Sequence, residues 1–227
     1  MKHPPCTSTI GTQNYIMKNT ITILTLLTAF AVNAQDKPVN PAVLKATREF
    51  EAKKAEASKG DPVVLYELGD LYYFGTGTGR NHAEAFKAYS ASAVKGYTLA
   101  EANLGYLYER GQGTGRDYKK AMEWYAKAAE KGHVKSMVEL GIFAKEGKAG
   151  RKKDYGEALK WFELAAEEGD GRALCEIGLL YEKGHGVQKD TGKSLKYFRE
   201  AAEKGDPEGQ FQIGLNYKSG VGVVQNY

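Results

Sequence analysis

The spacing of apolar residues predicts that most of this chain is helical. In residues 98–110, apolar side chains recur every three or four positions, which places them on one face of a helix. They are Ala100, Leu104, Leu107 and Tyr108. The glycine-rich segment 111–116 then interrupts the pattern. We therefore expect an amphipathic helix over residues 98–110 and a turn after it.

A second amphipathic helix is expected after this turn. Asp117 can cap it, because a carboxylate accepts hydrogen bonds from the free N–H groups of a first helical turn. The apolar face consists of Ala121, Met122, Trp124, Tyr125, Ala128 and Ala129. Gly132 is expected to end the helix, where glycine adopts the left-handed conformation at little cost. The two helices, named helix A and helix B, form a helical hairpin.

The same hairpin pattern recurs five times. Pairs of glycines mark it, at Gly60/Gly69, Gly96/Gly105, Gly132/Gly141, Gly169/Gly178 and Gly205/Gly214. Successive pairs are 36, 36, 37 and 36 residues apart. A fixed period in this range is typical of a solenoid of stacked units. The second glycine lies inside helix A and costs about 1 kcal/mol relative to alanine. We therefore expect another helix to pack there so closely that a Cβ would clash.

The repeated residues resemble the Sel-1-like repeat family, a relative of the tetratricopeptide repeats. The matching segments are Ala100–Tyr108 in helix A, the turn Gly111–Gly115, and Lys120–Gly132 in helix B. The resemblance implies an all-α, right-handed α-solenoid of about five stacked helical hairpins that binds proteins. Some cysteine-rich members carry a disulfide in each repeat and have been called β-lactamases. This chain lacks those cysteines, which weakens the transfer of that activity.

These patterns divide the chain into three parts. Residues 1–34 are predicted to be a signal peptide, and residues 35–59 a linker with an N-terminal capping helix. The repeats occupy residues 60–227, with units 60–95, 96–131, 132–168, 169–204 and an incomplete unit 205–227. The sequence stops at Tyr227, where helix B of the fifth unit should begin. We expect a truncated chain, and the alternative is that another element covers the last helix A.

The capping helix is expected to start at Asn40-Pro41, with Asn as the cap and Pro in the first turn, and to run to about Lys59. Its apolar stripe is weak and consists of Val43, Phe50, Ala52 and Ala55. Terminal repeats need such a polar cap for solubility.

The first 34 residues have the pattern of an export signal. The apolar run Ile21–Val32 follows Lys18 and precedes Ala34, which ends a short cleavage-site motif. The run is too short to span a bilayer, so no transmembrane anchor is expected in the mature chain. We predict that translation starts at Met17 and that the protein is periplasmic or secreted. The alternatives are a buried apolar segment and a cytoplasmic scaffold.

Composition and charge narrow the choice of partner. Lys and Arg number 32 against 28 for Asp and Glu. Residues 1–34 contain two lysines and no acid, so the remaining chain carries 30 against 28, a net charge of +2. This near-neutral balance argues against nucleic acid and against a polybasic membrane surface. Cys175 is the one cysteine of the mature chain, so it cannot form an intramolecular disulfide, and we expect it to fill space.

No catalytic or metal-binding constellation is evident, so no catalytic residue, cofactor or metal is predicted. Gly75–Gly79 resembles a phosphate-binding loop, but it follows a helix and recurs in other units as a turn. Ser92 and Lys95 match the S-x-x-K motif of serine β-lactamases, whose S-D-N and K-T-G partners are absent from the sequence. The histidines His82, His133 and His185 occupy unrelated positions of their units.

Candidate partner-binding positions come from helix A, which lines the concave face in the tetratricopeptide arrangement. Two positions that vary between units lie just after the second glycine and three residues later. With Tyr66, they supply the candidate groove: Tyr66, Asp70, Tyr73, Tyr106, Glu109, Lys145 and Glu182. Its N-terminal half is expected to be aromatic and acidic. The alternative is that some of these residues only pack between repeats.

The expected function is therefore an exported, non-catalytic scaffold that binds a protein or peptide partner through this groove. The alternative is a β-lactamase or another cell-envelope hydrolase of the cysteine-rich branch.

Overall fold

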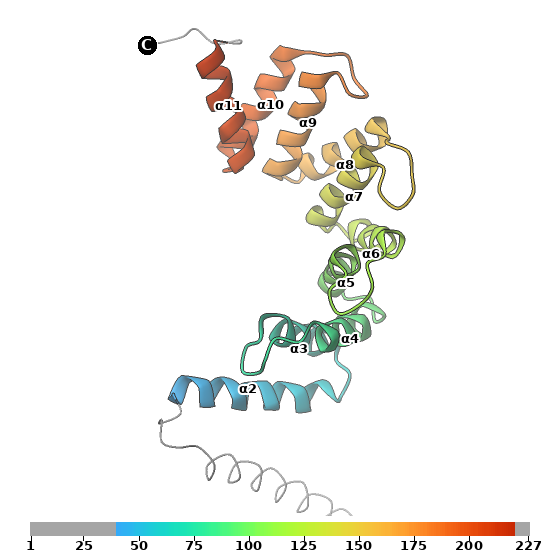
Figure 1. Cartoon of the computed structure of the whole chain (residues 1–227), viewed down its shortest axis with the longest axis vertical. Helices are drawn as coiled ribbons and strands as arrows, with labels where there is room; N and C mark the ends of the chain where they lie inside the picture. Colours follow the sequence, from blue (N-terminus) through green and yellow to red (C-terminus); the bar gives the residue numbers. More distant parts are fainter. Residues whose placement is uncertain (1–39, 221–227) are drawn as a thin grey trace, which may run out of the picture. The chain divides into compact units, whose positions relative to one another are not determined.

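The computed structural model describes residues 40–220 (Figure 1), so the predicted signal peptide, the Met17 start and the chain end at Tyr227 lie outside the described residues. Contacts divide the chain into residues 1–44 and 45–227. Residues 40–44, at the start of the first helix, belong to the first unit, and the rest of the architecture below belongs to the second. Ten helices and no strand occupy residues 40–220. They are α2 (Pro41–Ala57), α3 (Pro62–Phe74), α4 (His82–Ala93), α5 (Thr98–Arg110), α6 (Tyr118–Glu130), α7 (Val134–Glu146), α8 (Tyr155–Glu167), α9 (Gly171–Lys183), α10 (Thr191–Glu203) and α11 (Pro207–Ser219).

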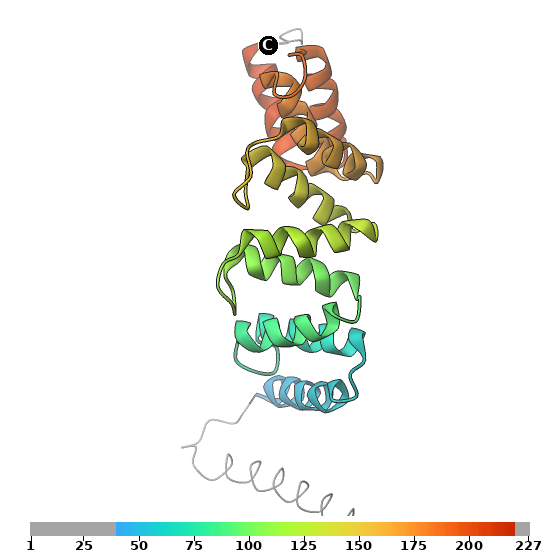
Figure 2. The same cartoon turned by 90° about the vertical axis from the view of Figure 1, so that its right-hand side faces the viewer.

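The helices pair as hairpins in chain order. The helices α3, α5, α7, α9 and α11 are A helices, and α4, α6, α8 and α10 are B helices. The A helices α3, α5, α7 and α9 each pack most closely on the B helix that follows, and each B helix packs on the next A helix. Figure 2 shows these hairpins layered in the order of the sequence. The predicted all-α solenoid is confirmed.

Caps fix where most helices begin and end. Asp117 accepts hydrogen bonds from the backbone N–H groups of Lys119 and Lys120, both at 3.1 Å, which confirms the predicted cap of α6. Helix α5 ends at Arg110, and the glycine that follows it, Gly111, has a φ of 68° in the left-handed region. Gly132, with φ of 84°, follows the last residues of α6 as predicted.

The glycine inside each A helix is a point of close approach. A Cβ on Gly69 would lie 2.5 Å from the ring of Tyr89, and a Cβ on Gly105 would lie 2.7 Å from the ring of Tyr125. Gly141 meets Phe162 and Gly178 meets Phe198 in the same way. The expected clash is therefore confirmed in four units. In α11 the described residues place no atom within 4 Å of such a Cβ on Gly214.

Helix α2 begins where the sequence predicts. The N–H of Ala42 donates to Oδ1 of Asn40 at 2.9 Å, and the helix ends at Ala57 rather than at Lys59. Phe50 is buried and its ring meets the Tyr72 ring of α3 edge-on, with centroids 5.2 Å apart. The predicted stripe is otherwise wrong, because Val43, Ala52 and Ala55 are exposed. Ala57 is buried instead, since it lies seven residues after Phe50 and shares its face.

Candidate binding groove

Helices α3, α4 and α5 line an open hollow of ≈ 220 Å³, and two of the candidate residues lie in its wall. Its lining consists of Tyr73, Tyr89, Asn103, Tyr106 and Leu107. We name it the tyrosine hollow. Two neighbouring repeats contribute to it, because α3 and α4 form one hairpin and α5 begins the next. The structure thus brings Tyr73 and Tyr106 together, although they are distant in sequence.

The two candidate tyrosines differ in how firmly they are held. The hydroxyl of Tyr73 donates to Oε1 of Gln112 at 3.2 Å, and its ring lies 5.0 Å from that of His82. Tyr106 is 38% exposed, and the guanidinium of Arg110 lies 5.5 Å from the centre of its ring. Tyr106 is therefore the side chain of the hollow that is most available to a partner.

Asp70 and Tyr66 both contact Tyr89, which lines the hollow. Asp70 accepts a hydrogen bond of 2.5 Å from the buried hydroxyl of Tyr89. Burial and this carboxylate raise the pKa of Tyr89, so the hydroxyl stays protonated and able to donate. The ring of Tyr66 packs between Tyr89 and Tyr97 at 5.7 and 5.2 Å. Burial, with Asp70 nearby, raises the pKa of Tyr66 to about 12.

Glu109 joins three elements. Its carboxylate accepts from the hydroxyl of Tyr125 at 3.0 Å, and it pairs with Lys148 at 2.9 Å. Burial lowers the pKa of Lys148, but its bonds to Glu109 and Glu146 outweigh burial and raise it overall. The Glu109 carboxylate thereby ties α5 to α6 and to the turn after α7. Its contact with a partner stays a prediction, and the structure gives it a packing role as well.

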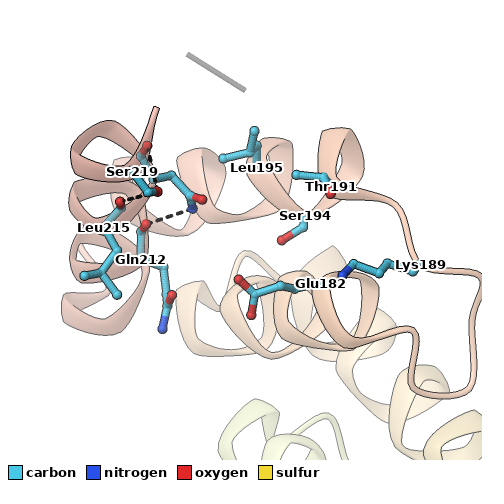
Figure 3. Close-up of a pocket in the computed structure, with 9 residues that line it drawn as sticks. Glu182, Lys189, Thr191, Ser194, Leu195, Gln212, Leu215 and Ser219 are labelled. Atoms are coloured by element: carbon cyan, nitrogen blue, oxygen red, sulfur yellow. Dashed lines mark hydrogen bonds between the residues drawn. The ribbon is translucent and has the colours of Figure 1, made fainter. Parts of the chain in front are cut away.

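Lys145 has a similar internal contact, because its ammonium group lies 2.6 Å from Glu176 and links α7 to α9. Glu182 lies in a different hollow, of ≈ 290 Å³, between α9, α10 and α11 (Figure 3). We name it the polar hollow. Its lining consists of Glu182, Lys189, Thr191, Ser194, Leu195, Gln212, Leu215, Asn216 and Ser219. The candidate residues thus divide between two hollows and the contacts between repeats.

The two hollows occupy equivalent places in the repeat. Tyr73 and Glu182 share one position of helix A, and Tyr106 and Leu215 share another. Sequence analysis missed Tyr89 and Asn103. Tyr89 belongs to the aromatic position of helix B, which predicts only packing. Asn103 precedes Tyr106 by three residues on α5, so helical periodicity could have identified it.

The described residues 40–220 contain no group of three His, Cys, Asp or Glu side chains that could hold a metal ion. Cys175 is buried as predicted, and burial raises the pKa of its thiol to about 12. Ser92 is also buried, and its hydroxyl donates to the carbonyl of Pro62 at 2.5 Å. In this part of the chain, no helix is both long enough and apolar enough to cross a bilayer.

Comparison with known proteins identifies the repeats. The family model described as Sel1 repeat matches residues 62–93, 98–133, 134–170, 171–206 and 207–227. No curated protein matches the chain. A Sel1 repeat protein from Oxalobacter formigenes is 32% identical with a TM-score of 0.71, over 82% of this chain and 78% of that chain.

Two further solved structures are similar. The protein c5321 of uropathogenic Escherichia coli, described as a protective antigen displaying an SLR fold, is 37% identical with a TM-score of 0.71. The match covers 78% of this chain but 38% of that chain. The immunity protein Pa5087 of Pseudomonas aeruginosa is 19% identical with a TM-score of 0.50, over 81% of this chain and 74% of that chain. This last likeness concerns the fold alone.

Proposed function

This chain belongs to the Sel1 repeat family, and from that premise we propose that it is an exported, non-catalytic scaffold that binds a protein or peptide partner through the groove of its A helices. Sel1 repeats typically act as scaffolds for protein interaction. Stacked helical hairpins suit this role, because they expose an extended binding surface rather than one enclosed pocket.

The tyrosine hollow is the observation that carries the proposal. It presents the exposed Tyr106 beside Tyr73, in a concave site with walls from two repeats. Tyrosine is favoured at binding sites because it buries a large area while losing few rotamers. Asn103 adds an amide that can pair with the backbone of an extended segment.

Capture from cell extracts tests the groove. The tagged protein would be incubated with lysate and envelope fractions, and the bound proteins identified by mass spectrometry. Tyr106→Ala should lose the specific partner, whereas Tyr217→Ala, a matched change of an exposed tyrosine on α11, should retain it. Equal recovery of the partner by Tyr106→Ala would show that the groove assignment is wrong.

Export is proposed from the sequence of residues 1–34. Sequencing the N-terminus of the protein isolated from cells tests it. We expect cleavage after Ala34, and an intact N-terminus in the mature cellular protein would contradict export.

No observation favours the hydrolase alternative. Purified protein should hydrolyse a chromogenic β-lactam no faster than a blank without protein. Hydrolysis that follows the protein through several chromatographic steps would overturn the non-catalytic assignment.

A further inference from the structure

The two acidic residues in the N-terminal half of the candidate groove already form contacts within the protein. Glu109 pairs with Lys148 and accepts from Tyr125, and Asp70 accepts from Tyr89. These contacts change the electrostatic expectation drawn from the sequence. The acids of the N-terminal half do not project as free charges toward a partner.

Two arginines instead lie at the rim of the tyrosine hollow. Arg110 is the last residue of α5, and its guanidinium lies over the Tyr106 ring at 5.5 Å. Arg80 precedes Asn81, whose N–H donates to the carbonyl of Tyr72 at 2.8 Å. That hydrogen bond places Arg80 beside the last turn of α3.

Both guanidiniums are exposed, and neither forms an ion pair within residues 40–220. Their charges also reach the hollow itself. Burial raises the pKa of Tyr73, with Tyr106 adding to the rise, while Arg80 and Arg110 oppose it. The tyrosine hollow thus combines aromatic walls with two positive charges that have no carboxylate partner within residues 40–220.

We propose that the tyrosine hollow binds an extended acidic segment of a partner protein, with an apolar side chain in the hollow and flanking carboxylates at Arg80 and Arg110. The tyrosine rings supply an apolar surface for the inserted side chain. The planar guanidinium suits a carboxylate, because it can donate two parallel hydrogen bonds. This inference rests on the proposed function and adds the chemistry of the partner.

The remaining charges near the site agree with this choice. Asp70 is half-buried, and one of its carboxylate oxygens accepts from the Tyr89 hydroxyl. A basic segment would bring its lysines or arginines against Arg80 and Arg110, and like charges placed together disfavour binding. The site therefore discriminates between acidic and basic segments.

Selection from a random displayed-peptide library tests the inference. The full chain would be immobilised, and the bound peptides sequenced after successive rounds. We expect enrichment of Asp and Glu next to aromatic or aliphatic residues. The double variant Arg80→Glu/Arg110→Glu should instead enrich Lys and Arg. Arg199→Glu, an exposed residue of α10, is the matched control and should select the same peptides as the unaltered chain.

Affinity measurements complete the test. A selected acidic peptide, labelled with a fluorophore, should bind the double variant about tenfold or more weakly than the unaltered chain or Arg199→Glu. Circular dichroism should show an unchanged fold, because both arginines are exposed.

The outcomes separate this inference from the proposed function. The inference of an acidic segment is overturned if basic or uncharged peptides are enriched, or if Arg80→Glu/Arg110→Glu selects the same peptides as the unaltered chain. Either result would leave peptide binding by the groove intact. If no peptides are enriched above the bare support, the inference of an acidic segment is overturned. That result would also count against peptide binding in the groove.

Discussion

At the scale of single residues, one glycine sets the distance between the two helices of each hairpin. Gly105 lies against the ring of Tyr125, and that ring is held in place by its hydrogen bond to Glu109. A side chain at this position must therefore displace a ring that has little freedom to move. Gly214 occupies the same position of α11, where the described residues leave the space open.

The pair of variants Gly105→Ala and Gly214→Ala tests this explanation. Gly105→Ala should destabilise the protein by about 1–3 kcal/mol, because overpacking exceeds the gain in helix propensity. Gly214→Ala should be neutral or stabilise by up to about 1 kcal/mol, because only the propensity changes. Urea unfolding followed by circular dichroism measures both values. Equal effects of the two substitutions would show that the ring contact does not require glycine.

A buried charge makes the second hairpin different from the others. Glu101 is only 3% exposed, and its Oε1 accepts from Lys131 at 2.6 Å. Oε2 has no hydrogen-bond partner in the described part of the chain. The equivalent positions hold the apolar Leu65, Met137 and Leu174 and, in the fifth unit, the uncharged polar Gln210. The ion pair thus compensates for a buried carboxylate at a position where three of the other repeats have an apolar side chain.

Removal of Lys131 should show how much the ion pair with Glu101 contributes to stability. Lys131→Met should destabilise the protein by about 1–3 kcal/mol, because it leaves a buried carboxylate uncompensated while the exposed ammonium group limits the effect. Adding Glu101→Leu to the same chain should restore most of the loss. Unfolding by urea compares the three proteins. A single variant as stable as the unaltered chain would show that the ion pair contributes nothing.

Residue-scale features could be predicted from sequence only where they repeat. The glycine contacts were predictable because the same residue recurs in every unit at a cost to the helix. The pairing of Glu109 with Lys148 was not, because it joins residues of different repeats through a turn of irregular length. The role of Arg80 and Arg110 beside the hollow could not be predicted for a related reason. The sequence gives the number of charges, and only the structure shows which of them form no ion pair.

At the scale of the helix, capping residues explain where most A helices start. Asp61, Asp170 and Asp206 cap α3, α9 and α11, and His133 takes the equivalent place at α7. Its Nδ1 accepts from the N–H of Ser136 at 3.3 Å, which requires that this nitrogen be unprotonated. Burial lowers the pKa of His133, and Lys135 lowers it further.

This cap predicts a loss of stability in acid. The folded chain binds fewer protons at His133 than the unfolded chain, whose pKa is about 6.5. The stabilisation is therefore present above about pH 6.5 and is lost as pH falls below it toward the lowered pKa. His133→Asp should remove this component, because a carboxylate caps the helix throughout that range. Urea midpoints at pH 5 and pH 7 compare the proteins, and an identical pH dependence would contradict the assigned role of His133.

Helix bounds were the most predictable part of the fold. The expected helix over residues 98–110 coincides with α5, because apolar spacing and the glycine that ends the helix are both local signals. The stripe on α2 was mostly wrong, because its burial depends on which face meets α3, and only Phe50 was chosen correctly. Local patterns thus define elements, whereas contacts between elements decide burial.

At the scale of the whole molecule, two repeats form a hollow at the same place, but different side chains line each hollow. The tyrosine hollow is aromatic with two arginines at its rim, whereas the polar hollow carries Glu182 and Lys189. The backbone of the repeat places both hollows, and the residues that vary between units give each its own chemistry. A scaffold of this kind can recognise successive parts of one extended partner.

Protection from hydrogen exchange would show directly whether a partner binds along the A helices. The protein would be mixed with its captured partner or a selected peptide, and amide exchange followed by mass spectrometry. We expect slower exchange in residues 66–73 and 103–110, which carry the tyrosine hollow, and unchanged exchange in α6 and α8. Protection confined to the B helices, with α3 and α5 unaffected, would contradict this expectation.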